Sequence, residues 1–506
     1  MPKLTVKQGS HVTFIRFEKM PVLSLVLAQN GFLSETPCGG KGVCGKCRMM
    51  AEGSLCELTA RERELLLPEE IRQGIRLSCQ ARLMGDARVS IPRPAELVNI
   101  AVEGQLPPFP YHPMEGRFGV AVDIGTTTLA LRLVDLKQCR VLQAVSAANP
   151  QGSIAADVIG RIEAAFNGEG DRLHGLLIRE LERLLNTLCQ KCSISPKDIG
   201  SVIMTGNTTM LYLLTRRNPV TLSRAPFEAD CLFGLWTDGE SLGLQGLSHA
   251  KVYLPACVSA FVGADIACGV LTSQMCKRQE SALLVDLGTN GEIALWHGGT
   301  LYSCATAAGP AFEGGNIRMG VGSVPGAIDR VWTENGKLCH TTLCGMKPTG
   351  ICGSGLLDAV AALLHLGIVD ETGLMESGEV VIGGEVSLCQ KDIRSVQLAK
   401  GAIAAGIKTV CHQVGISPSQ IGSLYIAGGF GSHVDVQNAA AIGLIPRELT
   451  GKAIVLDNAS LTGAVMLLLQ QGFVYDVMDI ARRAITIPLG GSGIFAEHYM
   501  ECMMFE

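Results

Sequence analysis

Four cysteines near the start of the chain have the type and spacing of a metal-cluster site. Cys38, Cys44 and Cys47 form a C-x5-C-x2-C pattern in the glycine-rich stretch ETPCGGKGVCGKCRMM, and Cys79 follows in RLSCQARL. Two tetrahedral irons need four thiolates, and the glycines allow backbone N–H groups to point at the sulfurs. A zinc site built from cysteines usually has paired C-x2-C knuckles, whereas this stretch has one. The pattern therefore favours a 2Fe–2S cluster over zinc.

A second stretch, FGVAVDIGTTTLALRLVDL at residues 118–136, has the composition of a phosphate-binding turn. Apolar runs predict two strands, joined by a turn that carries Asp123, Gly125, Thr126, Thr127 and Thr128. Gly125 has no Cβ to keep a phosphate away from the backbone, and the threonine hydroxyls can donate to phosphate oxygens. Asp123 ends an apolar strand, where it can hold Mg²⁺ directly or through its water shell.

The same pattern recurs later in the chain as SALLVDLGTNGEIALW. It places Asp286, Gly288, Thr289 and Asn290 in a second turn between two apolar strands. Two half-domains facing each other would bring both turns onto the β- and γ-phosphates of a nucleotide from opposite sides. The repeat therefore predicts a duplicated, two-lobed domain.

Two further glycine-rich segments complete the set. SLYIAGGFGSHVDVQNAAAIG runs from a strand through Gly428, Gly429 and Gly431 into a helix, where glycines allow close approach to a flat ligand such as adenosine. CGSGLLDAVAALLHLG places Gly353 at a helix N-terminus, which favours anions. Each turn alone is weak evidence, because α/β domains that bind no nucleotide also have glycine turns. The order and spacing of the turns together favour an ATP site.

The elements around these motifs predict the domain organisation. In residues 1–92, short alternating segments, a helix ending near Asn30 and a closing strand surround the cysteines. The proline-rich residues 93–116 predict an extended inter-domain linker. Residues 117–506 form the ATPase domain, with lobes at about 117–279 and 280–506.

Composition excludes several classes of protein. The 506 residues are 47% hydrophobic and 18% charged with a net charge of −5, which argues against nucleic-acid binding. No apolar run is long enough to span a membrane, and the N-terminus lacks the apolar segment of a signal peptide. In such a chain the 19 cysteines indicate a reducing compartment, so we expect a cytoplasmic protein with no membrane partner.

Two resemblances follow from these motifs. Residues 3–92 resemble the β-grasp ferredoxins, although the first cysteine gap is one residue longer than in the plant-type pattern C-x4-C-x2-C. The DIGTTT, DLGTNGE and AGGFG motifs resemble the phosphate-1, phosphate-2 and adenosine loops of the actin, sugar-kinase and chaperone ATPases. The fold implied is α/β: a β-grasp ferredoxin domain plus a two-lobed, actin-like (ribonuclease H-like, duplicated) ATPase domain.

The combination of both domains resembles the reductive activators of corrinoid-dependent methyltransferases and corrinoid proteins. AAGPAFEGG at residues 307–315 and CGSGLLD at 352–358 add to the likeness. The resemblance implies an ATP-dependent enzyme that passes one electron from its 2Fe–2S cluster to a Co(II) corrinoid on a partner protein and restores Co(I). It also implies ATP and Mg²⁺ as cofactors, a low-potential electron donor and a possible homodimer.

Roles for further residues follow as hypotheses. Asp123 and Asp286 would organise Mg²⁺-ATP, and the irregular loop at 304–320 would face the corrinoid partner. Glu292 and Glu313 are candidates for positioning the attacking water, and the sequence favours neither. Asp265 is a third candidate carboxylate in the cleft, and Asn207 could line the cleft or cap a helix.

Two other functions remain open at the level of sequence. One is a small-molecule kinase with a redox-sensing cluster, although Asp265, Glu292 and Glu313 do not lie in sugar-kinase-like motifs. The other is an ATP-gated partner protein that transfers no electrons. ATP turnover with and without a corrinoid protein would distinguish these alternatives.

Overall fold

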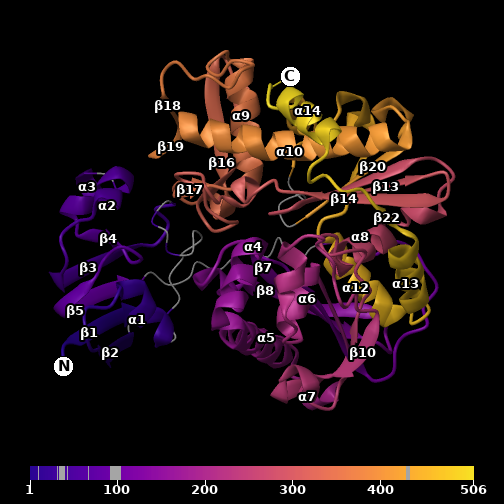
Figure 1. Ribbon diagram of the computed structural model, residues 1–506, viewed down its shortest axis with the longest axis horizontal. Helices are drawn as coiled ribbons and strands as arrows, with labels where there is room; N and C mark the ends of the chain where they lie inside the picture. Colours follow the sequence, from indigo (N-terminus) through magenta and orange to yellow (C-terminus); the bar gives the residue numbers. More distant parts are fainter. Residues whose placement is uncertain are drawn as a thin grey trace. The chain divides into compact units, whose positions relative to one another are not determined.

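The computed structural model describes residues 1–8, 11–30, 32, 40, 42, 44–66, 68–91, 104–428 and 434–505. The chain forms two compact units, Met1–Glu96 with Pro150–Glu169 and Leu97–Asn149 with Gly170–Glu506 (Figure 1). Cys38, Gly429, Gly431 and residues 93–103 of the predicted linker lie outside the described residues.

The first unit contains a five-stranded mixed sheet in the order β2-β1-β5-β3-β4. Its strands are β1 (Lys3–Gln8), β2 (His11–Arg16), β3 (Arg48–Leu55), β4 (Ile75–Leu77) and β5 (Leu83–Ile91). Helix α1 (Leu23–Gln29) buries Leu23 and Leu27 against the sheet, in one core with Leu4 and Val89. A helix packed on a mixed sheet confirms the β-grasp prediction. The unit also contains α2 (Ala60–Leu65), α3 (Pro68–Arg72) and α4 (Val158–Ala164).

The second unit contains two six-stranded sheets built on one plan. The first has the order β10-β11-β9-β6-β7-β8, and the second has the order β21-β20-β12-β13-β14-β22. In each, three consecutive strands form an antiparallel meander, and strands from later in the chain join its first strand in parallel: β9 joins β6, and β20 joins β12. The sequence repeat is therefore a structural duplication, which confirms the two-lobed fold.

The strands on either side of the two predicted turns, β6 with β7 and β12 with β13, lie in the apolar segments that predicted them. The first sheet consists of β6 (Phe118–Ile124), β7 (Thr128–Asp135), β8 (Arg140–Ala148), β9 (Ile199–Gly206), β10 (Leu235–Asp238) and β11 (Lys251–Leu254). The second consists of β12 (Ala282–Leu287), β13 (Gly291–His297), β14 (Thr300–Thr306), β20 (Ser423–Ala427), β21 (Ala453–Val455) and β22 (Ile485–Thr486).

Two buried helices lie between the sheets, side by side in Figure 1: α8 (Ala264–Ser273) and α12 (Ala459–Leu469). Every residue of α12 is buried, and the helix packs on β6 and β9 as well as on α8. The chain therefore returns to its first sheet after completing the second. Other helices of the first lobe are α5 (Gly170–Cys192), α6 (Thr208–Leu214) and α7 (Gly239–Leu242), and α13 (Phe473–Arg483) follows α12.

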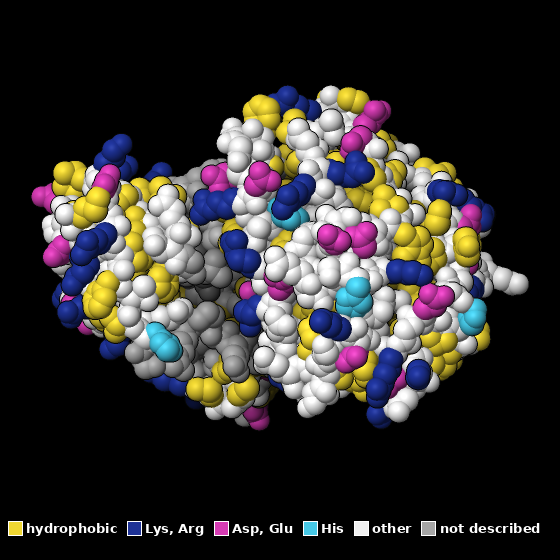
Figure 2. Space-filling view, turned by 90° about the horizontal axis from the view of Figure 1, so that it is seen from below, with side chains coloured by type: hydrophobic (Ala, Val, Ile, Leu, Met, Phe, Trp, Pro, Cys, Tyr) yellow, Lys and Arg dark blue, Asp and Glu magenta, His cyan; other side chains and the backbone are white. Residues whose placement is uncertain are grey.

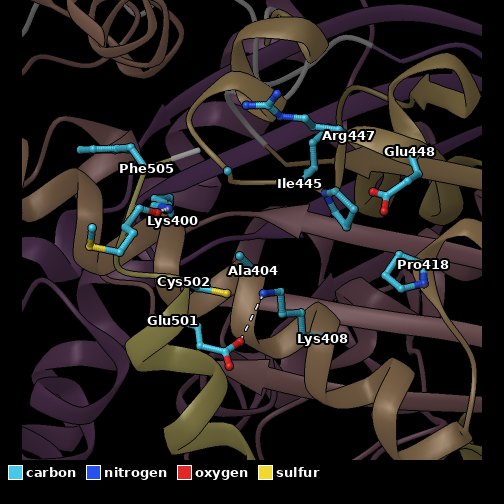
Figure 3. Close-up of a pocket in the computed structure, with 13 residues that line it drawn as sticks. Lys400, Ala404, Lys408, Pro418, Ile445, Arg447, Glu448, Glu501, Cys502 and Phe505 are labelled. Carbon is cyan, nitrogen blue, oxygen red and sulfur yellow. Dashed lines mark hydrogen bonds and ion pairs between the residues drawn. The ribbon is translucent and has the colours of Figure 1, made fainter. Parts of the chain in front are cut away.

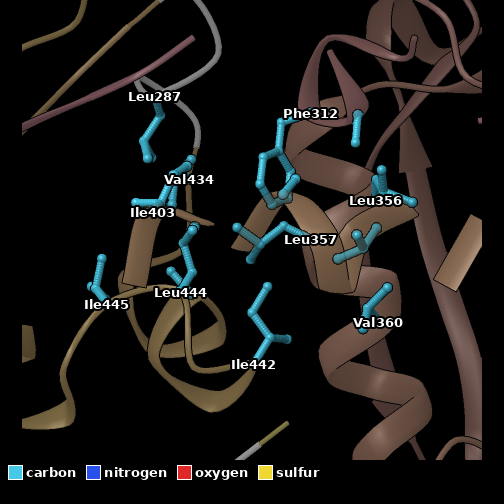
Figure 4. Close-up of a cluster of buried hydrophobic side chains, with 14 of the residues drawn as sticks. Leu287, Phe312, Leu356, Leu357, Val360, Ile403, Val434, Ile442, Leu444 and Ile445 are labelled. Atoms are coloured by element: carbon cyan, nitrogen blue, oxygen red, sulfur yellow. The ribbon is translucent and has the colours of Figure 1, made fainter. Parts of the chain in front are cut away.

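The second lobe carries additional elements that the sequence did not predict in detail. They include a sheet in the order β16-β15-β17 and a hairpin of β18 and β19. The bounds are β15 (Ala327–Glu334), β16 (Lys337–Thr342), β17 (Gly350–Ile351), β18 (Glu379–Gly383), β19 (Val386–Cys389), α9 (Gly353–His365), α10 (Gln390–Val414), α11 (Val436–Ala441) and α14 (Gly493–Glu501). Helices α9, α10 and α11 share a large apolar core (Figure 4).

The described half of the proline-rich segment, residues 104–116, is attached to the second unit. The backbone N–H of His112 donates to the carbonyl of Leu469 at 2.9 Å, and Met114 donates to Leu468 at the same distance. The ring of Phe109 lies 5.3 Å from that of Phe473. These contacts fix this half of the segment to the end of α12.

Charged side chains of both signs are interspersed over the face drawn in Figure 2. Within the described ranges, none of the helices has the length and apolarity needed to cross a membrane.

Candidate functional site

The first of the two predicted phosphate-binding turns joins β6 to β7. Gly125 donates its N–H to the carbonyl of Thr128 at 3.0 Å, which closes the turn. A Cβ on Gly125 would lie 2.6 Å from that carbonyl oxygen, so only glycine fits. Asp123 ends β6, next to Thr205 at the end of the parallel strand β9. The Asp123 carboxylate therefore lies at the carboxyl edge of the sheet, as predicted.

The second turn repeats this arrangement between β12 and β13. Asp286 ends β12 directly opposite Glu292 on β13. Gly428 follows β20 with a φ of +112°, and a Cβ there would lie 2.5 Å from the carbonyl oxygen of Leu287 and 3.0 Å from the Asp286 carboxylate. A side chain at Gly428 would therefore fill the space beside Asp286. Glycine keeps that space open.

Side chains from the two turns meet. The Thr127 and Thr289 hydroxyl oxygens lie 3.3 Å apart, and each hydroxyl donates to Oε2 of Glu313 at 2.6 Å. Thr127 comes from the first lobe, while Thr289 and Glu313 come from the second. The structure thus brings together both predicted phosphate turns and one of the two candidate glutamates.

Asp265 lies within electrostatic reach of three other carboxylates, Asp123, Asp286 and Glu292, and these four form an acidic cluster. Burial, and then the Asp265 and Asp123 charges, raise the pKa of Asp286 to about 8. Burial and the Asp123 charge likewise raise the pKa of Asp265 to about 7, and the pKa of Glu292 is raised well above its usual value. A cation would relieve this accumulation of negative charge.

The acidic cluster fits Mg²⁺ bound together with phosphate. Within the described residues, no three Asp, Glu, His or Cys side chains are placed to hold a metal ion by themselves. Mg²⁺ typically takes one or two carboxylates and completes its octahedron with water and substrate phosphates. Asp123 and Asp286, each beside a phosphate turn, are suited to that mode of binding.

Two residues that sequence reasoning missed hold Asp123 in place. Asn458 Nδ2 donates to Asp123 Oδ2 at 2.9 Å, and Ser460 Oγ donates to Oδ1 at 3.0 Å. Asn458 also caps α12 by accepting from the N–H of Leu461 at 2.7 Å. The DNAS sequence before an apolar run is an N-cap signal, but a cap alone does not reveal which carboxylate its side chain also binds.

Asn207 and Asp265, both ambiguous in the sequence, lie at the site. Asn207 caps α6 through Oδ1, and its Nδ2 donates to Thr126 Oγ1 at 3.0 Å, so it both caps a helix and lines the turn. Asp265 lies in the first turn of α8. A Cβ on the preceding Gly263 would lie 2.4 Å from the Cα of Asn207, so glycine allows α8 to begin against the β9–α6 turn.

The predicted anion site at the start of α9 has a packing explanation in the structure. Gly353 is buried and opens α9. A Cβ on Gly355 would lie 2.2 Å from the carbonyl oxygen of Ile328, and Ser354 Oγ donates to the carbonyl of Asp329 at 3.0 Å. These contacts dock the first turn of α9 onto β15, and a nucleotide role for Gly353 stays a prediction.

The cysteine site in the first unit contains the predicted ligands Cys44, Cys47 and Cys79, of which Cys47 and Cys79 are buried. The sulfurs of Cys47 and Cys79 lie 3.3 Å apart in a buried setting. Gly40, Gly42 and Gly45 have φ values of +80°, +69° and +64°, a left-handed conformation that glycine adopts without strain. The thiols of Cys47 and Cys79, which lie close together beside these glycines, form a donor set suited to an iron–sulfur cluster.

A cavity of about 290 Å³ lies elsewhere in the second lobe (Figure 3). It is lined by residues of α10 and α14, by the turn at residues 443–448 and by the tail at 502–505. The residues of the two phosphate turns are not among its described lining residues.

Comparisons with known proteins agree with this arrangement. The chain matches the family descriptions "RACo middle region" at residues 118–278 and "C-terminal domain of RACo the ASKHA domain" at residues 280–506. It is 34% identical over 420 residues to the corrinoid activation enzyme RamQ of Eubacterium limosum, which covers 77% of this chain and 70% of the relative.

Two further matches extend over most of the chain. It is 25% identical over 402 residues to the Co(II) methylated amine-specific corrinoid protein reductase of Methanosarcina barkeri, covering 72% of each. A solved structure named "Reductive activator for corrinoid,iron-sulfur protein" superposes with a TM-score of 0.73 at 26% identity, and covers 99% of this chain and 98% of that chain.

Proposed function

Because the chain belongs to the family of reductive activators of corrinoid proteins, we propose that it uses ATP to drive one electron from a 2Fe–2S cluster onto the Co(II) corrinoid of a partner protein. The transfer restores Co(I). The observation that carries the proposal is the meeting of Thr127 and Thr289 beside the acidic cluster, in a chain that also carries the clustered thiols of Cys47 and Cys79.

The energetics explain why such a protein needs ATP. A plant-type cluster has a potential near about −400 mV, and for a one-electron couple every ~59 mV uphill costs a factor of about ten in the equilibrium constant. ATP can shift that equilibrium only if it favours one conformation or complex over another. The two lobes, which touch through Thr127, Thr289 and Glu313, supply the element that nucleotide can bias.

Named residues would hold the nucleotide. Asp123 and Asp286 orient Mg²⁺, with Asp123 fixed by Asn458 and Ser460. Donors for the phosphates come from the first turn, Thr126 to Thr128, and from Thr289 and Asn290 of the second. Gly125 and Gly288 let the backbone approach the phosphates. Glycines at 428, 429 and 431 would serve the adenosine side, and Gly353 at the start of α9 would favour an anionic group.

The two candidate glutamates differ in character. Glu292 is 6% exposed, and burial together with Asp265 and Asp286 raises its pKa well above the usual value, which favours its protonated form. A protonated, buried carboxyl cannot take a proton from water. Glu313 is half-buried and already accepts two hydrogen bonds. Of the two glutamates, the proposal therefore retains Glu313.

The cluster would take Cys38, Cys44, Cys47 and Cys79 as ligands and accept electrons from a low-potential donor. When bound, it supplies a one-electron carrier.

We further propose the predicted division into a ferredoxin domain at 1–92, a linker at 93–116 and an ATPase domain at 117–506. The many free thiols suit a reducing compartment, so we place the reaction in the cytoplasm. A homodimer is compatible with this scheme.

Asp123→Ala tests the proposal most directly. We expect the variant to lose ATP-dependent formation of Co(I), followed by the absorption spectrum of a Co(II) corrinoid protein titrated under anaerobic conditions. Asp476→Ala, which removes an exposed carboxylate from α13, should retain the reaction. Full ATP-dependent Co(I) formation by Asp123→Ala would overturn the scheme.

The same assay separates the other two functions. A small-molecule kinase would turn over ATP only when its small substrate is present. A non-catalytic partner protein would show negligible ATP turnover with or without a corrinoid protein. The absorption spectrum of the anaerobically purified protein identifies the cluster type independently of activity.

A further inference from the structure

The two hydroxyls that would bind a terminal phosphate are already occupied by one carboxylate oxygen. Thr127 Oγ1 and Thr289 Oγ1 each donate to Oε2 of Glu313 at 2.6 Å. A threonine hydroxyl has a single proton to donate. Both hydroxyl protons are therefore used in hydrogen bonds to Glu313. Its carboxylate oxygen lies between the two hydroxyls, as an anionic phosphate oxygen would.

The backbone that carries Glu313 is firmly held. Glu313 ends a short turn (Ala311–Glu313) in which its own N–H donates to the carbonyl of Pro310 at 3.0 Å. The neighbouring Phe312 is 1% exposed and points into the apolar core beside Leu357 of α9 (Figure 4). A Cβ on Gly314 would lie 2.7 Å from the N–H nitrogen of Val321, so the chain after Glu313 is closely packed as well.

The contacts of the Glu313 carboxylate with Thr127 and Thr289 add to this anchoring, and they are the ones that a bound phosphate can break. A terminal phosphoryl group would need the protons of Thr127 and Thr289, and its negative charge would repel the Glu313 carboxylate at the same position. Glu313 and a terminal phosphoryl group therefore exclude each other. A diphosphate lacks that group and can leave the Glu313 contacts intact.

We propose that Glu313 senses the terminal phosphoryl group: its carboxylate joins Thr127 to Thr289 until a nucleoside triphosphate displaces it, and its release changes the loop at residues 304–320. The inference rests on the proposed nucleotide site and names the residue through which that site distinguishes triphosphate from diphosphate. Glu313 is thus a positioning residue that couples nucleotide state to the surface of the second lobe.

Nucleotide affinities test this role without any electron transfer. Calorimetric titration would give dissociation constants for a non-hydrolysable ATP analogue and for ADP, each with Mg²⁺, on the full chain. In Glu313→Ala the competitor is gone, so the analogue should bind about tenfold more tightly, while ADP affinity should change by less than about threefold. Glu313→Gln, which keeps the shape but loses the charge, should give a smaller shift of the same sign.

Glu376→Ala, the loss of an exposed acid elsewhere on the second lobe, should leave both affinities unchanged. Equal changes for the analogue and for ADP in Glu313→Ala, or weaker binding of the analogue, would overturn the inference. If the wild type binds neither nucleotide, the proposed function itself fails, so the two failures are distinguishable.

Hydrogen exchange supplies a second readout. Amides of residues 311–315 in the wild type should exchange faster with the ATP analogue than with ADP or no nucleotide. Glu313→Ala should show the faster exchange without nucleotide. Identical exchange in all three nucleotide states of the wild type would mean that Glu313 does not transmit the state of the site.

Discussion

Asp286 shows how the acidic cluster brings negative charges close together in the folded protein when no cation is bound. Its neighbours Asp265 and Asp123 are carboxylates too, and Glu292 lies opposite it across the β12–β13 pair. Like charges in a buried site favour protonation, which is why the pKa values of Asp286 and Asp265 rise to about 8 and about 7.

Asp286→Asn should stabilise the nucleotide-free protein. An asparagine keeps the shape of the side chain but removes one charge from the cluster, so the gain should be on the order of 1–3 kcal/mol near pH 8. Thermal unfolding without Mg²⁺ measures it. Asp479→Asn, which neutralises an exposed acid on α13, should show no such gain.

The pH dependence has a defined sign. The folded state keeps protons on Asp265 and Asp286 up to pH values near 7 and 8, whereas the unfolded chain releases them near pH 4. Wild-type stability from these groups therefore falls as pH rises from about 4 to about 8. The advantage of Asp286→Asn should grow over that range, and an advantage independent of pH would contradict the charge argument.

Sequence alone predicted the positions of the residues that belong to a local motif. Asp123, Asp286 and the turn threonines could be placed because an apolar strand ending in Asp-x-Gly-Thr has one geometry. Asn458 and Ser460 could not, because their contact with Asp123 depends on α12 returning to the first sheet. The burial of Glu292 likewise depends on packing beneath the turn.

At the level of elements, a buried ion pair joins α2 to β4 in the first unit. Glu62 is fully buried and accepts from Arg76 Nε at 2.7 Å and Nη2 at 2.9 Å. It also accepts from the N–H of Leu77 at 3.0 Å, two residues before Cys79. The pair therefore fixes the strand that presents the fourth predicted cluster ligand.

Glu62→Gln should destabilise the first unit by about 3–5 kcal/mol, because it leaves the Arg76 charge without its buried partner. Denaturant unfolding gives the loss, and the iron content of purified protein should fall with it. Glu64→Gln, on the same helix but in an exposed pair with Arg61, should change stability by less than about 1 kcal/mol. Equal losses in both variants would rule out a special role for the buried pair.

Protonation of Glu62 at low pH should destabilise the first unit as Glu62→Gln does. Burial pushes the pKa of Glu62 upward, but hydrogen bonds from Arg76, Thr59 and Leu77 outweigh it, so the pKa lies below its usual value. A carboxylate with a depressed pKa contributes stability that is present above its unfolded pKa, about 4.3, and is lost as pH falls through the folded value. The pH dependence of stability that Glu62 contributes therefore has the opposite sign to that of Asp286 and Asp265.

The tail of the chain is fastened to α10 by a buried lysine. Lys400 is 1% exposed, its Nζ donates to the carbonyl of Met504, and it lies 5.2 Å from the centre of the Phe505 ring (Figure 3). On the same helix, Lys408 pairs with Glu501 at 3.5 Å and is partly exposed. The sequence did not predict this attachment, because α10 and the tail are far apart in the chain.

Lys400→Met should destabilise the second unit by about 1–3 kcal/mol, because it removes the hydrogen bond that the buried Lys400 donates to the carbonyl of Met504. Lys408→Met makes the same replacement in an exposed pair, and should cost about 0–1 kcal/mol. Urea unfolding distinguishes the two, and limited proteolysis should cleave the tail of Lys400→Met first. A larger loss in Lys408→Met would contradict this account.

At the scale of the whole molecule, each unit has a buried core of its own. The first centres on residues such as Leu4, Leu27 and Val89, and the second on residues such as Leu283 and Leu357. Units with separate cores generally unfold separately. Scanning calorimetry should therefore resolve two transitions rather than one.

The variants assign those transitions. Glu62→Gln should lower the midpoint temperature of the first unit's transition alone, and Lys400→Met that of the second unit's transition alone. Asp286→Asn should raise the midpoint temperature of the second unit's transition at pH 8. Mg²⁺ with an ATP analogue should also raise only the transition that Lys400→Met lowers, because a ligand stabilises the body to which it binds. A single transition that shifted with both Glu62→Gln and Lys400→Met would show instead that electron carrier and ATPase unfold as one cooperative body.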